Sequence, residues 1–60
     1  MDYTLPSDPS MLMSFINMKL RDEYSNLDML CEDLDIDRQW LEDKLRQIGL
    51  EYSEEHNKFW

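Results

Sequence analysis

Apolar residues recur every three to five positions through the first half of the chain, which is the pattern of a helix with one buried side. It predicts a helix over residues 9–24. Asp8 or Ser7 can cap this helix, and Pro9 suits its first position because the N–H that proline lacks would have no helical partner there. The expected apolar stripe comprises Leu12, Phe15, Ile16, Leu20 and Tyr24.

A second, shorter helix is predicted to end near Leu34. Its start resembles a capping box, in which Ser25 caps the first turn and Asp28 reaches back to the backbone of Ser25. The residues expected on its inward face are Leu27, Leu30, Cys31 and Leu34.

The third predicted helix covers residues 38–48. Asp35 is expected to turn the chain before it in the left-handed conformation, and Asp37 is expected to cap it. Gly49 is the only glycine and stands where a helix C-cap favours one. The expected inward residues are Leu41, Lys44, Leu45 and Ile48, with Trp40 at the edge of that face.

After Gly49 the pattern changes to two short aromatic segments separated by a polar run, which predicts a β-hairpin over residues 50–60. Tyr52 and Phe59 are expected to dock on the helices. The whole chain, residues 1–60, is therefore expected to form one small, mainly α domain. It would contain an extended lead-in over residues 1–8, three helices within residues 9–48, and the C-terminal hairpin.

The second and third predicted helices resemble a helix-turn-helix, and with the hairpin behind them the order is similar to a miniature winged helix. The chemistry of DNA binding is missing, however. Glu42 and Asp43 lie on the would-be recognition helix, and Glu54 and Glu55 occupy the hairpin tip, where a wing would need basic residues. A winged-helix-derived, nucleic-acid-associated regulator is therefore the second hypothesis.

Charge, apolar run length and cysteine content restrict the expected partners and location of the protein. The 60 residues include 14 acidic and six basic side chains, and the net charge of −8 repels nucleic acid and anionic membranes. No apolar run approaches the ~20 residues that span a bilayer, and the N-terminus lacks the basic and apolar regions of a signal peptide. A single cysteine excludes an intrachain disulfide, so a cytoplasmic location is expected.

The sequence predicts no catalytic, cofactor or metal site. The run Asp33-Leu34-Asp35-Ile36-Asp37 has the spacing that opens a calcium loop. The glycine and glutamate that such a loop also needs are replaced by Arg38 and Lys44. Cys31 and His56 are too few to hold zinc. Cys31 is expected to be buried as a small apolar residue and His56 to be solvated. We therefore expect neither an enzyme nor a small-molecule substrate.

Large apolar side chains outnumber what so small a core can cover, because a 60-residue domain buries only about 60% of the surface of its unfolded chain. Met11 and Met18 are expected to fill gaps in the core. The remaining surplus predicts a surface for a protein partner or for a second copy of the chain, as in a homodimer. The candidate binding residues of this kind are Met13, Met29, Trp40 and Trp60.

Several short motifs together resemble one family. They are Leu5-Pro6-x-Asp8-Pro9, Ser14-x-x-Asn17-x-Lys19-Leu20-Arg21-Asp22, Leu27-Asp28-x-Leu30-Cys31 and Tyr52…Asn57-x-Phe59. With these motifs, the chain resembles domain of unknown function 4250, a family of short bacterial proteins. The resemblance implies a stand-alone bacterial protein and brings no functional residues with it.

The same motifs draw attention to two polar residues of the first helix. Arg21 could pair with a carboxylate of the second or third helix and so hold the helices together. The alternative is that Asn17 and Arg21 contact a partner, which makes them the last two candidate binding residues.

Overall fold

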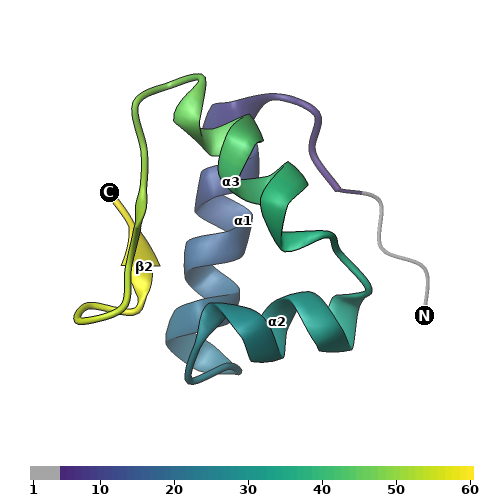
Figure 1. The fold of residues 1–60 in the computed structure, drawn as a ribbon, viewed down its shortest axis with the longest axis vertical. Helices are drawn as coiled ribbons and strands as arrows, with labels where there is room; N and C mark the ends of the chain where they lie inside the picture. Colours follow the sequence, from purple (N-terminus) through teal and green to yellow (C-terminus); the bar gives the residue numbers. More distant parts are fainter. Residues whose placement is uncertain (1–4) are drawn as a thin grey trace.

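The computed structural model describes residues 5–60 and has the predicted mainly α architecture (Figure 1). Residues 1–4 of the predicted lead-in lie outside the described part. The elements in chain order are α1 (Pro9–Asp22), α2 (Leu27–Leu34), α3 (Arg38–Arg46), β1 (Tyr52–Ser53) and β2 (Lys58–Phe59). The turn of residues 35–37 joins α2 to α3, and the two strands form an antiparallel hairpin.

Helix α1 begins as predicted and ends two residues early. The Asp8 carboxylate accepts the N–H of Met11 at 3.2 Å, and Pro9 occupies the first turn. At the other end, the N–H groups of both Glu23 and Tyr24 donate to the carbonyl of Lys19, at 2.8 and 3.1 Å. The longer of these bonds spans five residues, so the chain has already left the helix before Tyr24.

The cap of α2 is Asn26, and the prediction of Ser25 was wrong. The backbone of Asn26 is extended, and its side-chain oxygen accepts the N–H of Met29 at 2.8 Å. The Ser25 hydroxyl contacts the Met29 sulfur at 3.1 Å, and Asp28 bonds to Arg38 at 2.6 Å instead of reaching back. An asparagine oxygen meets the third N–H of a helix from the residue just before it.

Two residues with positive φ end α2 and α3. Asp35 has φ 56° and ψ 49°, and Asp37 caps α3 by accepting the N–H of Gln39 at 3.1 Å, both as predicted. Gly49 has φ 80°, and its N–H donates to the carbonyl of Arg46 at 2.9 Å. This C-terminal motif ends α3 at Arg46, short of the predicted residue 48.

Ile48 was predicted to face the core and does not. It lies beyond the end of α3, where the helical spacing no longer sets the direction of a side chain, and it is 41% exposed. The N–H of Leu50 donates to the carbonyl of Leu45 at 3.1 Å, which carries the chain past Ile48 toward the hairpin.

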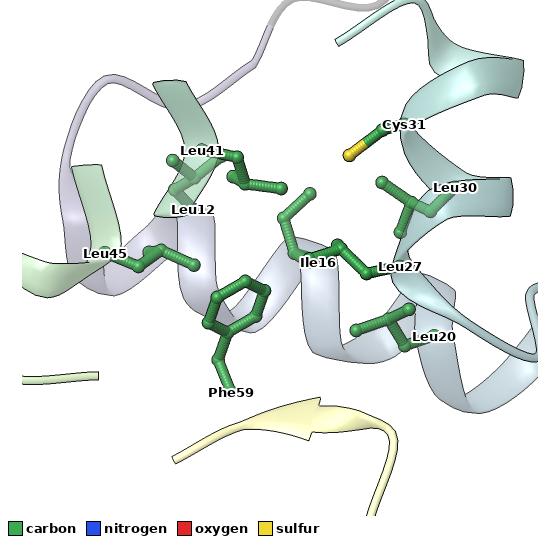
Figure 2. Close-up of a cluster of buried hydrophobic side chains, with 9 residues drawn as sticks. All are labelled: Leu12, Ile16, Leu20, Leu27, Leu30, Cys31, Leu41, Leu45 and Phe59. Carbon is green, nitrogen blue, oxygen red and sulfur yellow. The ribbon is translucent and has the colours of Figure 1, made fainter. Parts of the chain in front are cut away.

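One apolar core lies where all these elements meet α1 (Figure 2). Leu41 of α3 lies beside Leu12 of α1, while α2 approaches the second half of α1 (Figures 1 and 2). Phe59 of β2 is 1% exposed and enters the core from the hairpin side. The buried residues of this core are Leu12, Ile16, Leu20, Leu27, Leu30, Cys31, Leu41, Leu45 and Phe59.

Candidate functional site

The hairpin is attached to α1 by the side chain of Asn17. Its Nδ2 donates to the carbonyl of Phe59 at 2.9 Å, and its Oδ1 accepts the N–H of Phe59 at 2.8 Å. The amide thus satisfies both main-chain polar groups of a strand residue, as a neighbouring strand would. Tyr52 of β1 is the register partner of Phe59, and the centroids of the two rings lie 5.5 Å apart.

Asn57, in the turn before β2, joins three elements. Its Nδ2 donates to the carbonyls of Leu20 and Tyr24, both at 3.0 Å, at the end of α1. Its Oδ1 accepts the Tyr52 hydroxyl hydrogen at 2.7 Å, and the Tyr52 oxygen accepts the N–H of Leu27 at 3.2 Å. One network therefore ties the end of α1, the start of α2 and the hairpin together.

Beside these amides, α1 and the hairpin enclose an open groove, which we call the α1–hairpin groove. Its rim carries Met18 and Arg21 from α1, and His56 and Lys58 from the hairpin. The complete lining is Ser14, Asn17, Met18, Leu20, Arg21, His56, Asn57 and Lys58. Asn17 and Asn57 bond within the chain, as do Arg21 with Asp22 and His56 with Ser53, so Met18 and Lys58 are the rim residues without a side-chain hydrogen bond among the described residues.

Trp60 extends the rim of this groove. Its ring centroid lies 4.2 Å from that of His56, and the Lys58 ammonium lies 4.6 Å from the Trp60 ring centre. Residues 56, 58 and 60 therefore group on the side of the hairpin away from buried Phe59. Trp60 remains 59% exposed although its ring is held on two sides.

The prediction that Arg21 pairs with a carboxylate of α2 or α3 was wrong. Its guanidinium forms two hydrogen bonds to the adjacent Asp22, at 2.9 and 3.2 Å, on the same helix. The hydrogen bond to Arg21 lowers the pKa of the Asp22 carboxyl. The Arg21 side chain is 75% exposed, because its position on α1 points away from both neighbouring helices. It holds no helices together.

A second hollow of opposite charge lies between the end of α1 and α2, and we call it the α1–α2 hollow. Its lining comprises Glu23, Tyr24, Met29, Glu32 and Asp33. The Tyr24 hydroxyl donates to Asp33, and Glu23 pairs with Lys19 at 2.6 Å. Met29, which is 49% exposed, thus stands among three carboxylates.

The structure gathers only part of the predicted binding residues. Asn17 and Arg21 line the α1–hairpin groove, Trp60 adjoins it, and Met29 lines the α1–α2 hollow. Trp40 is 44% exposed on α3 and lines neither.

Methionines were the least well predicted. Met13, a predicted binding residue, is half-buried and packs against the core. Met11 and Met18, which were expected to fill the core, are 62% and 44% exposed. Both lie on the side of α1 away from buried Leu12 and Ile16, where the helix meets neither α2 nor α3.

Sequence reasoning missed Met18, His56 and Lys58 as rim residues. Lys58 and Trp60 flank buried Phe59 with the two-residue period of a strand, and this could have placed both on one face. His56 lies in the turn before β2, where this period does not apply. No such signal exists for Met18, because the docking of the hairpin on α1 determines which hairpin residues lie beside it.

The described residues include few side chains placed for catalysis or metal binding. Cys31 is 6% exposed, as predicted for a small core residue, and burial raises the pKa of its thiol. Within residues 5–60, no three histidine, cysteine, aspartate or glutamate side chains come close enough to share a metal ion.

No helix among the described residues has both the length and the apolar character needed to cross a membrane.

Comparison with known proteins identifies a family for this chain. Residues 6–59 match the model of one family, described as domain of unknown function DUF4250. No curated protein and no solved structure matches the chain at a significant level. Asn17, Tyr52, Asn57 and Phe59, which carried the resemblance in the sequence, are the residues that hold the hairpin to the helices. The chain belongs to the DUF4250 family.

Proposed function

We propose that this protein is an interaction module without catalytic activity, which binds a polypeptide through the α1–hairpin groove and Trp60. The observation that carries the proposal is the presentation of Trp60. Its ring is 59% exposed, yet His56 and Lys58 hold it in place. A constrained tryptophan loses little conformational entropy on binding, and tryptophan is enriched among residues that dominate interface energetics.

The charges of the groove specify the partner. Arg21 and Lys58 are two of only six basic residues in a chain with a net charge of −8. Lys58 has no ion-pair partner among the described residues, and its ammonium lies over the Trp60 ring. A polypeptide that presents carboxylates next to an apolar side chain complements this rim. The free thiol of Cys31 suits a reducing compartment, so we place the protein in the cytoplasm.

Nucleic-acid binding, the second hypothesis, gains no support from α3. Asp43 accepts hydrogen bonds from Gln39 at 3.0 Å and from Arg46 at 3.1 Å. The two side chains of α3 that would meet phosphates or bases on this face are therefore already bonded to a carboxylate. No basic stripe crosses the exposed face of the described helices.

The proposal is tested by comparing two tryptophan variants. The tagged protein is used to isolate polypeptides from a native extract, and the polypeptide retained is purified and titrated by calorimetry. Trp60→Ala is expected to weaken its binding at least tenfold, which is typical of a tryptophan at the centre of an interface. Trp40→Ala is the matched control, because Trp40 has similar exposure but lies outside the groove.

Binding to a second copy of the chain counts equally if it depends on Trp60. If Trp40→Ala and Trp60→Ala weaken binding equally, the α1–hairpin groove is not the specific binding site. Retention of full binding by Trp60→Ala would contradict it directly.

A further inference from the structure

Three hollows adjoin one another around the end of α1, and we call them together the furrow. A third shallow hollow, lined by residues 20–25 and Asn57, shares Arg21 and Asn57 with the α1–hairpin groove. It also shares Glu23 and Tyr24 with the α1–α2 hollow. Lys58 gives the hairpin end of the furrow a positive charge, since Arg21 there is balanced by Asp22, and Glu32 and Asp33 make the α2 end acidic.

An exposed methionine stands in each end of the furrow. Met18 lies with Arg21 and Lys58 at the basic end, and Met29 lies with Glu32 and Asp33 at the acidic end. The two methionines are 44% and 49% exposed. Each end thus combines a flexible apolar side chain with charge of one sign, and the two signs are opposite.

We propose that the occupant of the α1–hairpin groove is a second copy of this chain, in a two-fold dimer that pairs the basic end of each furrow with the acidic end of the other. This inference rests on the proposed function and names its partner. In the dimer, Lys58 of one copy faces Glu32 of the other, and the same contact recurs on the other side of the symmetry axis.

Two-fold symmetry is what this charge arrangement favours. A two-fold interface brings the same surface of both copies together, so residue i meets residue j and j meets i. A surface of one sign would repel itself in that arrangement. A furrow whose basic and acidic ends lie side by side becomes complementary to itself after a half-turn.

Size and charge place limits on the dimer. A standard interface buries about 800 Å² of each partner, which is about a fifth of the 4157 Å² surface of this chain. Each copy carries a net charge of −8, so the copies repel one another at long range. Near-physiological salt, where the Debye length is about 8 Å, screens that repulsion while close pairs persist. The test is therefore made under those conditions.

The experiment exchanges charges between the two ends of the furrow. Sedimentation equilibrium of the purified full chain is measured for wild type, Lys58→Glu, Glu32→Lys and an equimolar mixture of the two variants. Neither position forms an ion pair among the described residues, so both variants are expected to fold, and circular dichroism checks this. Lys44→Glu, on α3, is the control for the same change of charge outside the furrow.

Wild type is expected to dimerise with micromolar affinity. Each single variant places like charges at both symmetric contacts and is expected to dimerise at least tenfold more weakly. The mixture restores opposite charges at both contacts and is expected to recover wild-type association as a heterodimer. Its total charge equals that of two wild-type copies, so net charge cannot account for the recovery. Lys44→Glu is expected to dimerise like wild type.

Three results would overturn the inference. They are a wild-type monomer throughout the concentration range, single variants that dimerise normally, and species that grow beyond a dimer with concentration. A wild-type monomer that still binds another polypeptide through Trp60 would refute only the dimer and leave the proposed function standing. If Lys58→Glu leaves dimerisation unchanged and Trp40→Ala abolishes it, both the dimer and the proposed function are refuted.

Discussion

The side-chain amide of Asn17 and the main chain of Phe59, 42 residues apart, exchange two hydrogen bonds of 2.9 and 2.8 Å. The hairpin needs this contact because each of its strands has only two residues, and an isolated two-stranded hairpin is marginally stable in water. The same contact sets the position of β2 on α1, and so the shape of the α1–hairpin groove.

Replacing Asn17 by aspartate removes the donor to the Phe59 carbonyl and places a carboxylate beside it. The half-buried carbonyl loses its partner, so the free energy of unfolding is expected to fall by about 1–3 kcal/mol. Urea denaturation measures this loss. Gln47→Glu makes the same amide-to-acid change at an exposed position with no side-chain hydrogen bond among the described residues. Because Gln47 is the C-cap of α3, the added negative charge is expected to cost only about 0.3–1 kcal/mol. Equal effects of the two substitutions would mean that charge alone is responsible.

Substitutions of Asn57 separate its hydrogen bonds from its backbone conformation. Asn57 has φ 51°, which glycine adopts freely and alanine does not. Asn57→Gly is expected to destabilise the fold by about 1–3 kcal/mol through the lost hydrogen bonds. Asn57→Ala is expected to cost about 1 kcal/mol more, because it adds left-handed strain. Chemical denaturation of both variants gives the difference, and equal stabilities would show that the left-handed conformation carries no cost here.

Tyr52→Phe tests the link between the hairpin and α2. The substitution keeps the ring packed against Phe59 and removes the hydroxyl that joins Leu27 to Asn57. The free energy of unfolding is expected to fall by about 1–2 kcal/mol, since the N–H of Leu27 and the oxygen of Asn57 both lose a partner. In a double-mutant cycle with Asn57→Gly, the two effects are expected to be non-additive. Strict additivity would show that the hydroxyl and the amide act independently.

Asp35→Gly is expected to stabilise the protein. Asp35 holds φ 56° at the end of α2, is exposed, and has no side-chain partner among the described residues. Glycine removes the steric cost of this conformation, and the change also removes a negative charge from the negative end of the helix dipole. A gain of about 0.5–1 kcal/mol is expected, offset in part by the greater freedom of glycine in the unfolded chain. Thermal unfolding measures it, and Asp35→Ala is expected to lower the melting temperature instead.

The buried thiol of Cys31 predicts a specific loss of stability in alkali. Burial raises its pKa in the folded state, so above the ordinary thiol pKa the unfolded chain loses the proton first. Ionisation therefore favours unfolding progressively as the pH rises above that value. Melting temperatures across this pH range are expected to fall more steeply for wild type than for Cys31→Ala, which lacks the thiol. Parallel curves for the two proteins would contradict the burial of the thiol.

Local signals in the sequence were sufficient for most of the fold. Asp8 and Pro9 at the start of α1, Asp35 and Asp37 in the turn, and Gly49 after α3 each act through the backbone of their immediate neighbours. Such short-range chemistry can be recognised without knowing the rest of the structure. Where two neighbours offered competing caps, at Ser25 and Asn26, the prediction chose the wrong one, because both side chains can accept an N–H of the first turn.

The candidate site was less predictable for a different reason. Met18 and Met13 both lie on α1, and Met18 borders a groove only because the hairpin docks beside it. Arg21 was predicted to pair with a carboxylate of the second or third helix, and its actual partner is the adjacent Asp22. These outcomes depend on distances between segments far apart in the chain.

The sequence by itself determined the three helices, the starts of α1 and α3, the turn after α2, the hairpin and the negative net charge, because capping, periodicity and charge are properties of neighbouring residues. Only the tertiary structure decided that Asn17 and Asn57 hold the hairpin, and that Met18, Arg21, Lys58 and Trp60 meet around one groove. The physical reason is that an amide binds whichever main-chain groups packing brings to it, and a surface forms only where separate elements come together.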